Sequence, residues 1–397
     1  MKKIVDDNMC YGCGACENVC PQNCIRMEYD QYGFLHPIID EASCIDCKLC
    51  QKRCIALSES TDIDILKDNK YIGINKDRNV QLNSSSGGAF TAIAESLGNG
   101  NTIFCGAKFN SQMMVVHGWT NDVKQLAQFR KSKYVQSKTD VIYKQIKEFL
   151  EAGKRVVFSG TPCQVAGLYA SLGKSYEELF TIDLICTGVS SPGLFQKYVN
   201  MLQKKYRSDI VHIDMRHKVK KDGEWNIGDT EVKFKDGSTL RNKTTRLYRS
   251  LYGQKGISYR ESCYQCKYAC MNRQGDFTIG DWWGSLEKLE GVSEHNGISA
   301  LFFNSRKSQK FYNKLSEKML LAPISDEELE KDNPTLSHPT LKTKRSRKFR
   351  NDYLVLNESK ILNRYSKPEM KVYIAWLVSR IIPKVIREKI KDVLLNK

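Results

Sequence analysis

The sequence predicts an α/β protein with a cysteine-rich module in front of its main domain and a helical tail behind it. Three observations support this. Eight of the 15 cysteines lie in two evenly spaced runs within the first 54 residues. Between residues 71 and 320, apolar strand-like segments alternate with helix-like patterns, which is typical of α/β layers. Residues 321–397 are basic and helix-like, and 397 residues suffice for two or three domains.

The N-terminal module, residues 1–57, contains the spacing C-x2-C-x2-C-x3-C twice. In bacterial-type two-cluster ferredoxins, three closely spaced thiolates of such a run bind one [4Fe–4S] cluster and the fourth binds its neighbour. We therefore expect clusters on Cys10, Cys13, Cys16 and Cys54, and on Cys44, Cys47, Cys50 and Cys20. Zinc or disulfides are the alternatives, but zinc sites favour separated C-x2-C pairs. Cys24 is predicted to be a small buried residue.

A polar stretch, residues 58–70, is predicted to link the module to the body. Strands are expected at 102–109, 114–119, 155–159, 180–186, 210–215, 231–234, 277–280 and 298–303. Helices are expected at 88–97, 141–152, 162–172, 194–206 and 306–320. The alternation of the two types predicts that the body, residues 71–320, is an α/β domain.

A serine- and glycine-rich segment, residues 84–88, precedes the predicted helix 88–97. Glycines let the backbone approach a ligand closely, and the free N–H groups at a helix start bind phosphate. The segment therefore predicts a pyrophosphate cradle for a dinucleotide. A flexible linker that ends in a helix cap explains these residues equally well. Downstream, residues 130–137 place three cations beside Tyr134 and could bind an anion, or form a solvated basic face.

A further cysteine group in the body has the spacing C-x2-C-x3-C. Its members are Cys263, Cys266 and Cys270. Three ligands need a fourth, and Cys163 is a candidate because it follows Pro162 at a predicted helix start, where the helix dipole favours a thiolate. We expect Cys163 to complete a third [4Fe–4S] cluster, with Cys186 as the substitute and Cys105 also available. A zinc site, or a buried inert Cys163, is the alternative.

Six segments of the body occur in a characteristic order. They are SSGG at 85–88, SKYVQS at 132–137, GTPCQ at 160–164, DLICTGVSSP at 183–192, the cysteine group 263–270, and GDWWG at 280–284. In this order they resemble the beta subunit of coenzyme F420 hydrogenases and dehydrogenases, a family that includes the 7-hydroxymethyl chlorophyll a reductase of plants. The resemblance covers residues 71–320, with the ferredoxin run fused in front as in some F420-oxidising members.

The resemblance implies a bound FAD, a [4Fe–4S] cluster near it, and hydride exchange between the flavin and a second redox molecule. It implies that Ser85, Ser86, Gly87 and Gly88 hold the FAD phosphates. It implies a flavin region lined by Lys133, Tyr134, Gln136, Gly160, Thr161 and Gln164. It implies a third cluster on Cys163, Cys263, Cys266 and Cys270. Thr187 is a departure, because the family often has histidine there; if that histidine handles protons, this protein has another donor or another substrate.

The expected function is that of an iron–sulfur flavoprotein oxidoreductase, which passes electrons between the ferredoxin-type clusters, FAD and a second redox substrate. That substrate is a coenzyme F420-like deazaflavin or an unidentified biosynthetic intermediate, for example in surface polysaccharide synthesis. The sequence identifies no catalytic residue. Ferredoxin is an expected redox partner, and a partner subunit is the other option. The alternatives are a non-catalytic electron-transfer subunit and a zinc-stabilised interaction protein.

The net charge of +17 is unevenly distributed. Residues 1–70 contain 8 Lys and Arg against 12 Asp and Glu, whereas residues 341–397 contain 16 against 5. The basic run 342–350 is accompanied by no nucleic-acid-binding motif, so nucleic acid is not an expected partner. The apolar stretch 372–382 and the basic residues after it are expected to dock on the body or on a partner. Peripheral contact with an anionic membrane surface is the alternative.

The expected location is the cytoplasm. The first residues lack the apolar core of a secretion signal, and no run of 18 uncharged apolar residues is present. Cluster-bound thiolates also need a reducing compartment. Peripheral association with the inner membrane surface, through the basic tail, remains open at this point.

Overall fold

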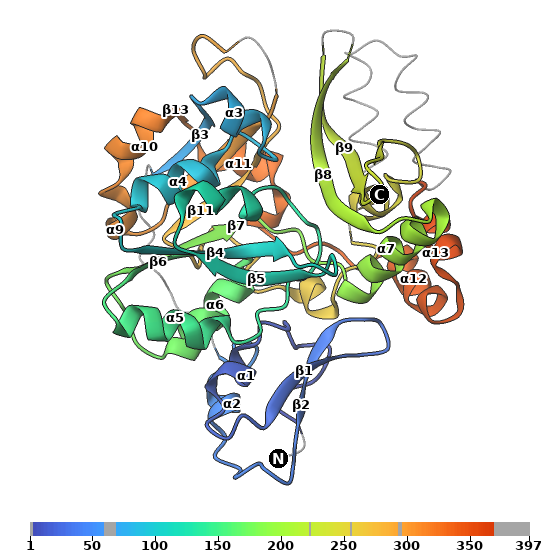
Figure 1. Cartoon of the computed structure of the whole chain (residues 1–397). Helices are drawn as coiled ribbons and strands as arrows, with labels where there is room; N and C mark the ends of the chain where they lie inside the picture. Colours follow the sequence, from blue (N-terminus) through green and yellow to red (C-terminus); the bar gives the residue numbers. More distant parts are fainter. Residues whose placement is uncertain (1–2, 59–68, 222–223, 255, 293–295, 369–397) are drawn as a thin grey trace.

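The computed structural model describes residues 3–58, 69–221, 224–254, 256–292 and 296–368. Figure 1 shows a small N-terminal module below a body built on a large sheet, with a helical C-terminal segment beside the body. The apolar stretch 372–382 lies outside the described residues. Within the described part of the chain, no helix is long and apolar enough to cross a membrane.

The module is a hairpin flanked by two short helices. Helix α1 (Ala15–Val19) precedes strands β1 (Ile25–Tyr29) and β2 (Leu35–Ile39), and α2 (Leu49–Lys52) follows them. The strands pair antiparallel, with Ile25 opposite Ile39. Each cysteine run therefore begins in a loop and ends at a short helix, which lets three closely spaced thiols point to one side.

The body sheet has eight strands in the order β13-β3-β12-β11-β7-β6-β4-β5. Their bounds are β3 Lys70–Asn75, β4 Thr102–Phe109, β5 Val115–Thr120, β6 Arg155–Gly160, β7 Leu179–Leu184, β11 Phe277–Trp282, β12 Ile298–Phe303 and β13 Met319–Pro323. The central strands β4, β6, β7 and β11 are parallel, and the outer strands are antiparallel. The predicted α/β fold class is confirmed.

Helices cover both faces of this sheet. They are α3 Arg78–Leu82, α4 Ala89–Leu97, α5 Ile142–Glu151, α6 Pro162–Leu172, α9 Arg306–Gln309, α10 Tyr312–Lys318 and α11 Asp326–Asp332, with 3-10 turns at Val123–Phe129, Glu261–Gln265 and Pro334–Leu336. Phe104 and Val157 pack in the core of α4, whereas Ile103 and Val156 pack with α5 and α6. Successive strand residues face opposite ways, so the central strands are buried on both sides.

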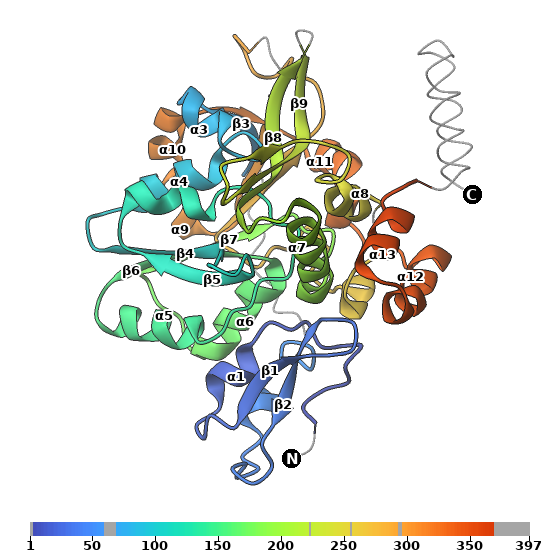
Figure 2. The same ribbon diagram turned by 45° about the vertical axis from the view of Figure 1, so that its right-hand side comes forward.

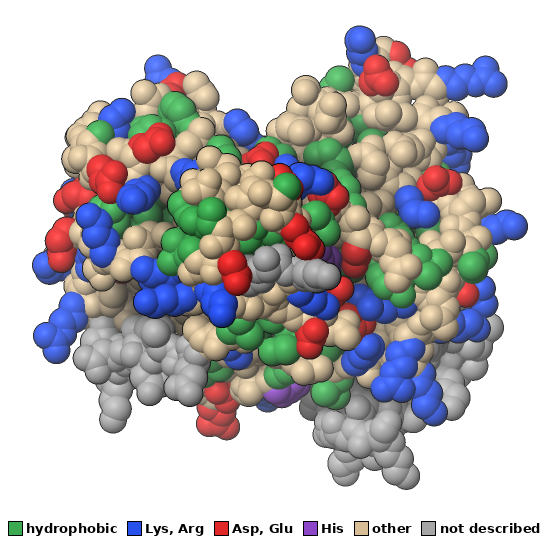
Figure 3. Space-filling model, turned by 90° about the horizontal axis from the view of Figure 1, so that it is seen from below, with side chains coloured by type: hydrophobic (Ala, Val, Ile, Leu, Met, Phe, Trp, Pro, Cys, Tyr) green, Lys and Arg blue, Asp and Glu red, His purple; other side chains and the backbone are tan. Residues whose placement is uncertain are grey.

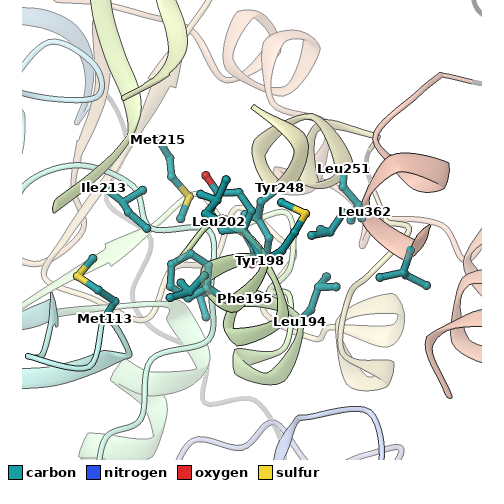
Figure 4. Packing of buried hydrophobic residues seen from close by; sticks show 14 of the residues in the cluster. Met113, Leu194, Phe195, Tyr198, Leu202, Ile213, Met215, Tyr248, Leu251 and Leu362 are labelled. Atoms are coloured by element: carbon teal, nitrogen blue, oxygen red, sulfur yellow. The ribbon is translucent and has the colours of Figure 1, made fainter. Parts of the chain in front are cut away.

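A second core joins a smaller sheet to the C-terminal helices. The sheet is formed by β8 (Ile210–Lys221), β9 (Glu224–Phe234) and β10 (Thr239–Leu240). The helices are α7 (Pro192–Tyr206), α8 (Leu247–Gly253), α12 (Lys344–Val355) and α13 (Glu358–Tyr365). Figure 4 shows Phe195 and Tyr198 of α7 meeting Tyr248 of α8 and residues of β8, with Leu362 of α13 at the edge. The first part of the tail is thus an integral part of the fold.

The expected helix 306–320 is wrong in its last part. The chain forms α9 and α10 but enters strand β13 at Met319, where it pairs antiparallel with β3, Met319 lying opposite Asn75. Strand pairing and the burial of Met319 outweigh local helix preference here. Strand β3 itself begins at Lys70, within the expected linker, and the expected domain boundary at 320 divides β13.

Candidate redox site

The cysteines of the module line two separate cavities. One, called the inner cavity, is lined by Cys10, Cys13, Cys16 and Cys54. The other, called the outer cavity, is lined by Cys20, Cys44, Cys47 and Cys50, together with Cys24. Each cavity thus takes three thiols from one run and the last thiol of the other. Among the described residues, no three Cys, His, Asp or Glu side chains gather tightly enough to hold a single metal ion.

Cys24 lies close to the outer cysteines. Its Sγ is 3.4 Å from the Sγ of Cys20, and it is buried. Its burial agrees with the expectation. The sequence did not indicate, however, that Cys24 would line the outer cavity beside the expected ligands.

The inner cavity faces the body. The carbonyl of Cys13 accepts hydrogen bonds from the hydroxyls of Tyr143 (3.0 Å) and Thr139 (3.2 Å). The carbonyl of Cys10 accepts from Nε of Arg260 (2.6 Å) and from the hydroxyl of Ser262 (3.0 Å). These donors come from segments more than 120 residues away in the chain. The loop that holds the first three cysteines is therefore bound firmly to the body.

Two glycines make this close approach sterically feasible. Gly12 and Gly14 have φ of 62° and 78°, in the left-handed region that favours glycine. A Cβ on Gly12 would come within 2.6 Å of Gln136 Nε2, and one on Gly14 within 2.1 Å of Thr139 Oγ1. Both positions therefore need glycine for the backbone conformation and for the contact with the body.

The outer cavity lies at the free end of the module. Cys47 is exposed, and the neighbouring Ile45 is 62% exposed. Figure 2 shows the module beneath α5 and α6, with the loop between β2 and α2 pointing away from the body. Seen from that side in Figure 3, hydrophobic, acidic and basic side chains are mixed over the middle of the face.

Cys163 lies in the first turn of α6, as expected. Thr161 is the N-cap and forms a capping box with Gln164, and Pro162 occupies the first helical position. The hydroxyl of Thr161 lies 3.1 Å from Cys163 Sγ. Burial nevertheless raises the pKa of Cys163 to about 11, so for the free thiol desolvation outweighs the helix-start dipole that the sequence suggested.

Four body cysteines form one group, called the body quartet: Cys163, Cys186, Cys263 and Cys266. Burial raises the pKa of each of their thiols, and every pair within the quartet adds electrostatic repulsion to that effect. The Sγ of Cys270 instead points to the carbonyl oxygens of Asn272 (3.2 Å) and Lys267 (3.5 Å). Cys270 adds electrostatic repulsion to Cys266 as well, so it borders the group, and the structure brings both candidate fourth ligands, Cys163 and Cys186, to it.

The loop that follows the quartet is held by a buried ion pair. Arg273 lies 3.4 Å from Asp183 and donates to the carbonyls of Cys270 (3.0 Å) and Tyr268 (3.2 Å). Asp183 also accepts from the backbone N–H of Gln274. Cys105, the further candidate, is buried in the core between the sheet and α5 and is not a member of the quartet.

The glycine-rich segment before α4 is fixed rather than flexible. The Ser85 hydroxyl oxygen accepts from the N–H of Ser132 (2.8 Å), the Ser86 hydroxyl donates to the Ile298 carbonyl, and the Gly87 N–H donates to Ser299 Oγ (3.0 Å). A Cβ on Gly87 would lie 2.3 Å from the Gly73 carbonyl oxygen. Gly88 has a φ of 91°. Packing and backbone conformation thus explain both glycines, and the flexible-linker interpretation is wrong.

Two buried cations beside this segment were missed from the sequence. Arg216 donates to the Ser85 carbonyl (2.9 Å), and Lys218 donates to the Ser86 carbonyl (2.7 Å). Both lie on β8, two residues apart, so they face the same side. Arg216 is paired with Asp281 (2.7 Å) of the GDWWG motif. The charged residues alternating along β8 were the pattern in the sequence that could have indicated these buried cations.

The expected flavin-lining residues have three different environments. Lys133 is buried, and its ammonium donates to the carbonyls of Arg130 (2.8 Å) and Lys131 (3.1 Å); burial lowers its pKa to about 7. Tyr134 accepts a hydrogen bond from Arg216 (3.1 Å) and so touches the glycine-rich segment indirectly. Gln136 reaches the module, donating to the Tyr11 carbonyl (2.8 Å). This motif is thus divided between the two sides of the site.

The remaining expected flavin-lining residues, Gly160, Thr161 and Gln164, lie on the loop between β6 and α6. Gly160 ends β6, and Thr161 and Gln164 are engaged in the capping box. Gln164 also donates to the Ser137 hydroxyl (3.0 Å). His117, missed from the sequence, lies between Ser137 Oγ (3.0 Å) and the Ser159 carbonyl (3.1 Å), and burial lowers its pKa to about 4.

Comparison with known families decides how the body is classified. Residues 153–327 match the C-terminal region of the coenzyme F420 hydrogenase/dehydrogenase beta subunit. This region belongs to that beta-subunit family. Residues 9–56 match the 4Fe-4S dicluster domain, which confirms a two-cluster iron–sulfur module in front of the beta-subunit domain.

Two individual proteins are similar to parts of the chain. An uncharacterized ferredoxin of Methanocaldococcus jannaschii is 31% identical over 70 residues, which is 18% of this chain and 41% of that protein. A chain of the F420-reducing [NiFe] hydrogenase complex from Methanosarcina barkeri aligns over 74% of this chain and 94% of its own length, with 15% identity and a TM-score of 0.43.

Proposed function

We propose that the protein is an iron–sulfur flavoprotein oxidoreductase in which electrons pass between an outer cluster, an inner cluster, a body cluster and FAD. The order of the cysteine sets carries this proposal. The inner cavity is docked against the part of the body that holds the body quartet, and the outer cavity is turned away from it. The outer cysteines therefore neighbour the inner ones, and the inner ones neighbour the body quartet.

The contact between the inner cavity and the body quartet is apolar and close. The rings of Tyr11 and Tyr268 pack with centroids 5.5 Å apart. Cys163 and Cys266 pack against the same hydrophobic cluster as Cys13. At Gly167 of α6, a Cβ would lie 3.1 Å from the Cys13 Sγ. Gly167 lies one helical turn after Cys163, so the inner cavity approaches α6 closely there, and this arrangement supports electron exchange between the two sites.

The ligand set that the geometry favours for the body cluster is the body quartet, Cys163, Cys186, Cys263 and Cys266. It differs from the set expected from the sequence in replacing Cys270 by Cys186. The hydrogen bonds of Cys270 to backbone carbonyls support this exchange. Four thiolates are the usual ligands of a [4Fe–4S] cluster.

The surroundings of the glycine-rich segment fit the phosphates of FAD. The backbone N–H groups of Ala89 and Phe90, in the first turn of α4, make no hydrogen bond within the described part of the chain. Arg216, which is paired with Asp281, and Lys218, whose pKa burial lowers to about 7, lie beside this segment and bind the Ser85 and Ser86 carbonyls. Free N–H groups at a helix start together with cations favour an anionic ligand. FAD, when bound, would supply hydride acceptance and single-electron release.

A hydroxyl cluster occupies the place where the family often has histidine. Thr187 Oγ1 lies 3.1 Å from the hydroxyl of Tyr259 and 3.3 Å from that of Tyr252. The Tyr252 ring packs on Tyr134 with centroids 4.4 Å apart, and Tyr134 in turn binds Arg216. These hydroxyls are the groups we propose to hold and move a proton beside the flavin. The substrate class is a hydride donor or acceptor such as an F420-like deazaflavin.

The test is the cofactor content of the anaerobically purified full chain. We expect about 12 iron atoms, as three [4Fe–4S] clusters, and one FAD per chain. Cys186→Ser should remove about four irons, whereas the matched variant Cys270→Ser should retain them. Retention of all iron by Cys186→Ser, with loss in Cys270→Ser, would restore the set expected from the sequence.

A second measurement separates an enzyme from an electron-transfer subunit. If the protein binds its substrate itself, reduced F420 or another small hydride donor reduces the flavin of the isolated chain. If only reduced ferredoxin does so, the deazaflavin assignment fails and the protein serves a partner enzyme. A preparation with zinc and no flavin would contradict both functions.

A further inference from the structure

Three arginine side chains are almost wholly buried in the described part of the chain, and one differs from the others. Arg216, Arg260 and Arg273 are 1%, 2% and 3% exposed. Arg216 is paired with Asp281 at 2.7 Å, and Arg273 with Asp183 at 3.4 Å. Among the described residues, no carboxylate lies within ion-pairing distance of Arg260.

The partners of Arg260 are neutral groups. Its guanidinium donates to the carbonyls of Cys10 (2.6 Å) and Leu35 (2.9 Å) and to Oε1 of Gln136 (2.9 Å). Nη2 also lies 3.0 Å from Nε2 of His36. Asp30 is linked to Arg260 only through this imidazole, 3.5 Å from its Nε2. Four of the five N–H donors thus have neutral partners, but the positive charge is not neutralised.

A buried ion without a countercharge is strongly unfavourable. The position of Arg260 indicates where the countercharge comes from. Its side chain binds the Cys10 carbonyl in the wall of the inner cavity, and its own carbonyl accepts the N–H of Cys263 (3.0 Å), a member of the body quartet. Its charge also reaches Cys163. A [4Fe–4S] core with four thiolates carries a charge of about −2.

We propose that Arg260 is the shared counter-ion of the inner cluster and the body cluster, and that it raises the reduction potential of both relative to the outer cluster. The inference rests on the proposed body cluster for one of its two parts. Reduction adds one negative charge to a cluster, and a buried cation beside it stabilises that charge. Arg260 is a positioning residue that contacts both sites, through its side chain at Cys10 and through its backbone carbonyl at Cys263.

The experiment is an EPR-monitored redox titration of the anaerobically loaded full chain. The outer cluster is identified by the signal that Cys47→Ser alters. We expect Arg260→Gln to lower the midpoint potentials of the inner and body clusters and to leave the outer one unchanged. Ser262→Ala is the matched control, because it removes a neutral donor from the same Cys10 carbonyl. Unchanged potentials in Arg260→Gln, or an equal shift in Ser262→Ala, would overturn the inference.

If Arg260→Gln loses iron, the lysine variant Arg260→Lys, which keeps the positive charge, tests whether the charge is the reason. Recovery of iron in the lysine variant supports the counter-ion role, whereas equal loss in both variants contradicts it. The two proposals fail separately. If the wild-type protein has only two clusters, the proposed body cluster falls, and the inner cluster still reports on Arg260. If three clusters are present and none responds, only the role of Arg260 falls.

Discussion

The inner and outer cavities have the same cysteine spacing but different surroundings. Side chains of the body bind the loop of the inner cavity, whereas the outer cavity ends at a surface where Cys47 is exposed. This loop can approach the body because Gly12 and Gly14 have no side chains. The loop before α2 carries exposed polar residues such as Asp46 and Lys48 instead. A repeated motif thus gives one site held against the body and another with an exposed cysteine.

The largest expected effect is a difference in the survival of the two clusters. Treatment of the loaded chain with a mild oxidant and an iron chelator should destroy the outer cluster first, because Cys47 is exposed whereas each inner cysteine is buried or partly buried. Iron release followed with EPR measures this. Simultaneous loss of both clusters would show that the body does not protect the inner one.

If the module separates from the body, the inner and outer clusters should become equally sensitive to the chelator. Gly33, in the β1–β2 turn, has a φ of 75°, and a Cβ there would lie 2.6 Å from the Gly193 Cα at the start of α7. Gly33→Ala should therefore cost more than the about 1 to 2 kcal/mol of left-handed strain alone. Urea unfolding and the chelation assay measure the effect.

The matched control for this change is Gly237→Ala. Gly237 has a φ of 86°, and no atom lies within 4 Å of a Cβ placed there. It should show the backbone strain without the clash, and should leave the protection of the inner cluster unchanged. Equal destabilisation in both variants would mean that the contact with Gly193 does not hold the module in place.

A smaller change at the same interface tests the hydrogen bonds. Tyr143→Phe removes the hydroxyl whose oxygen lies 3.0 Å from the Cys13 carbonyl and 2.9 Å from the Gln164 carbonyl, and whose single proton is donated between them. Loss of a buried donor should lower the free energy of unfolding by about 1 to 3 kcal/mol. Tyr176→Phe is the control, since its hydroxyl makes one exposed 3.5 Å contact with Glu151 and its loss should have no measurable effect.

The effect expected to be smallest at neutral pH concerns His36 in the interface. Burial and the charge of Arg260 lower the pKa of His36 to about 4, with Arg350 acting in the same direction and Asp30 and Asp7 opposing them. The unfolded chain binds a proton at this histidine below pH about 6.5, and the folded protein does so only near pH 4. Stability from this group is therefore lost as pH falls from 6.5 to 4.

His36→Gln should remove this part of the pH dependence without changing stability at pH 8. The buried His117 contributes a slope of the same sign, so the comparison is the difference between variant and wild type across pH 4 to 7. The exposed His338→Gln serves as the control. An unchanged slope in His36→Gln would show that protonation here is not linked to docking of the module.

The strands were predicted well where apolar runs cross the core. β4 and β12 have the expected bounds, because their side chains are buried in a pattern that local sequence expresses. β13 was not predicted, because Met319–Pro323 becomes a strand only by pairing with β3. Within the site, the basic motif 130–137 was singled out correctly as unusual. The sequence could not show that Lys133 would be bound by carbonyls of its own loop while Gln136 would contact the module.

The sequence by itself determined the cysteine runs, the two-cluster module and the family of the body, because ligand spacing and motif order are local properties of the chain. Only the tertiary structure decided which cavity faces the body, which cysteines gather in the body quartet, and where the buried charge of Arg260 lies. Arg260 is 250 residues from the Cys10 carbonyl that it binds, and Cys186 follows strand β7 whereas Cys263 lies in the 3-10 turn Glu261–Gln265. Packing of distant segments, rather than spacing, sets such contacts.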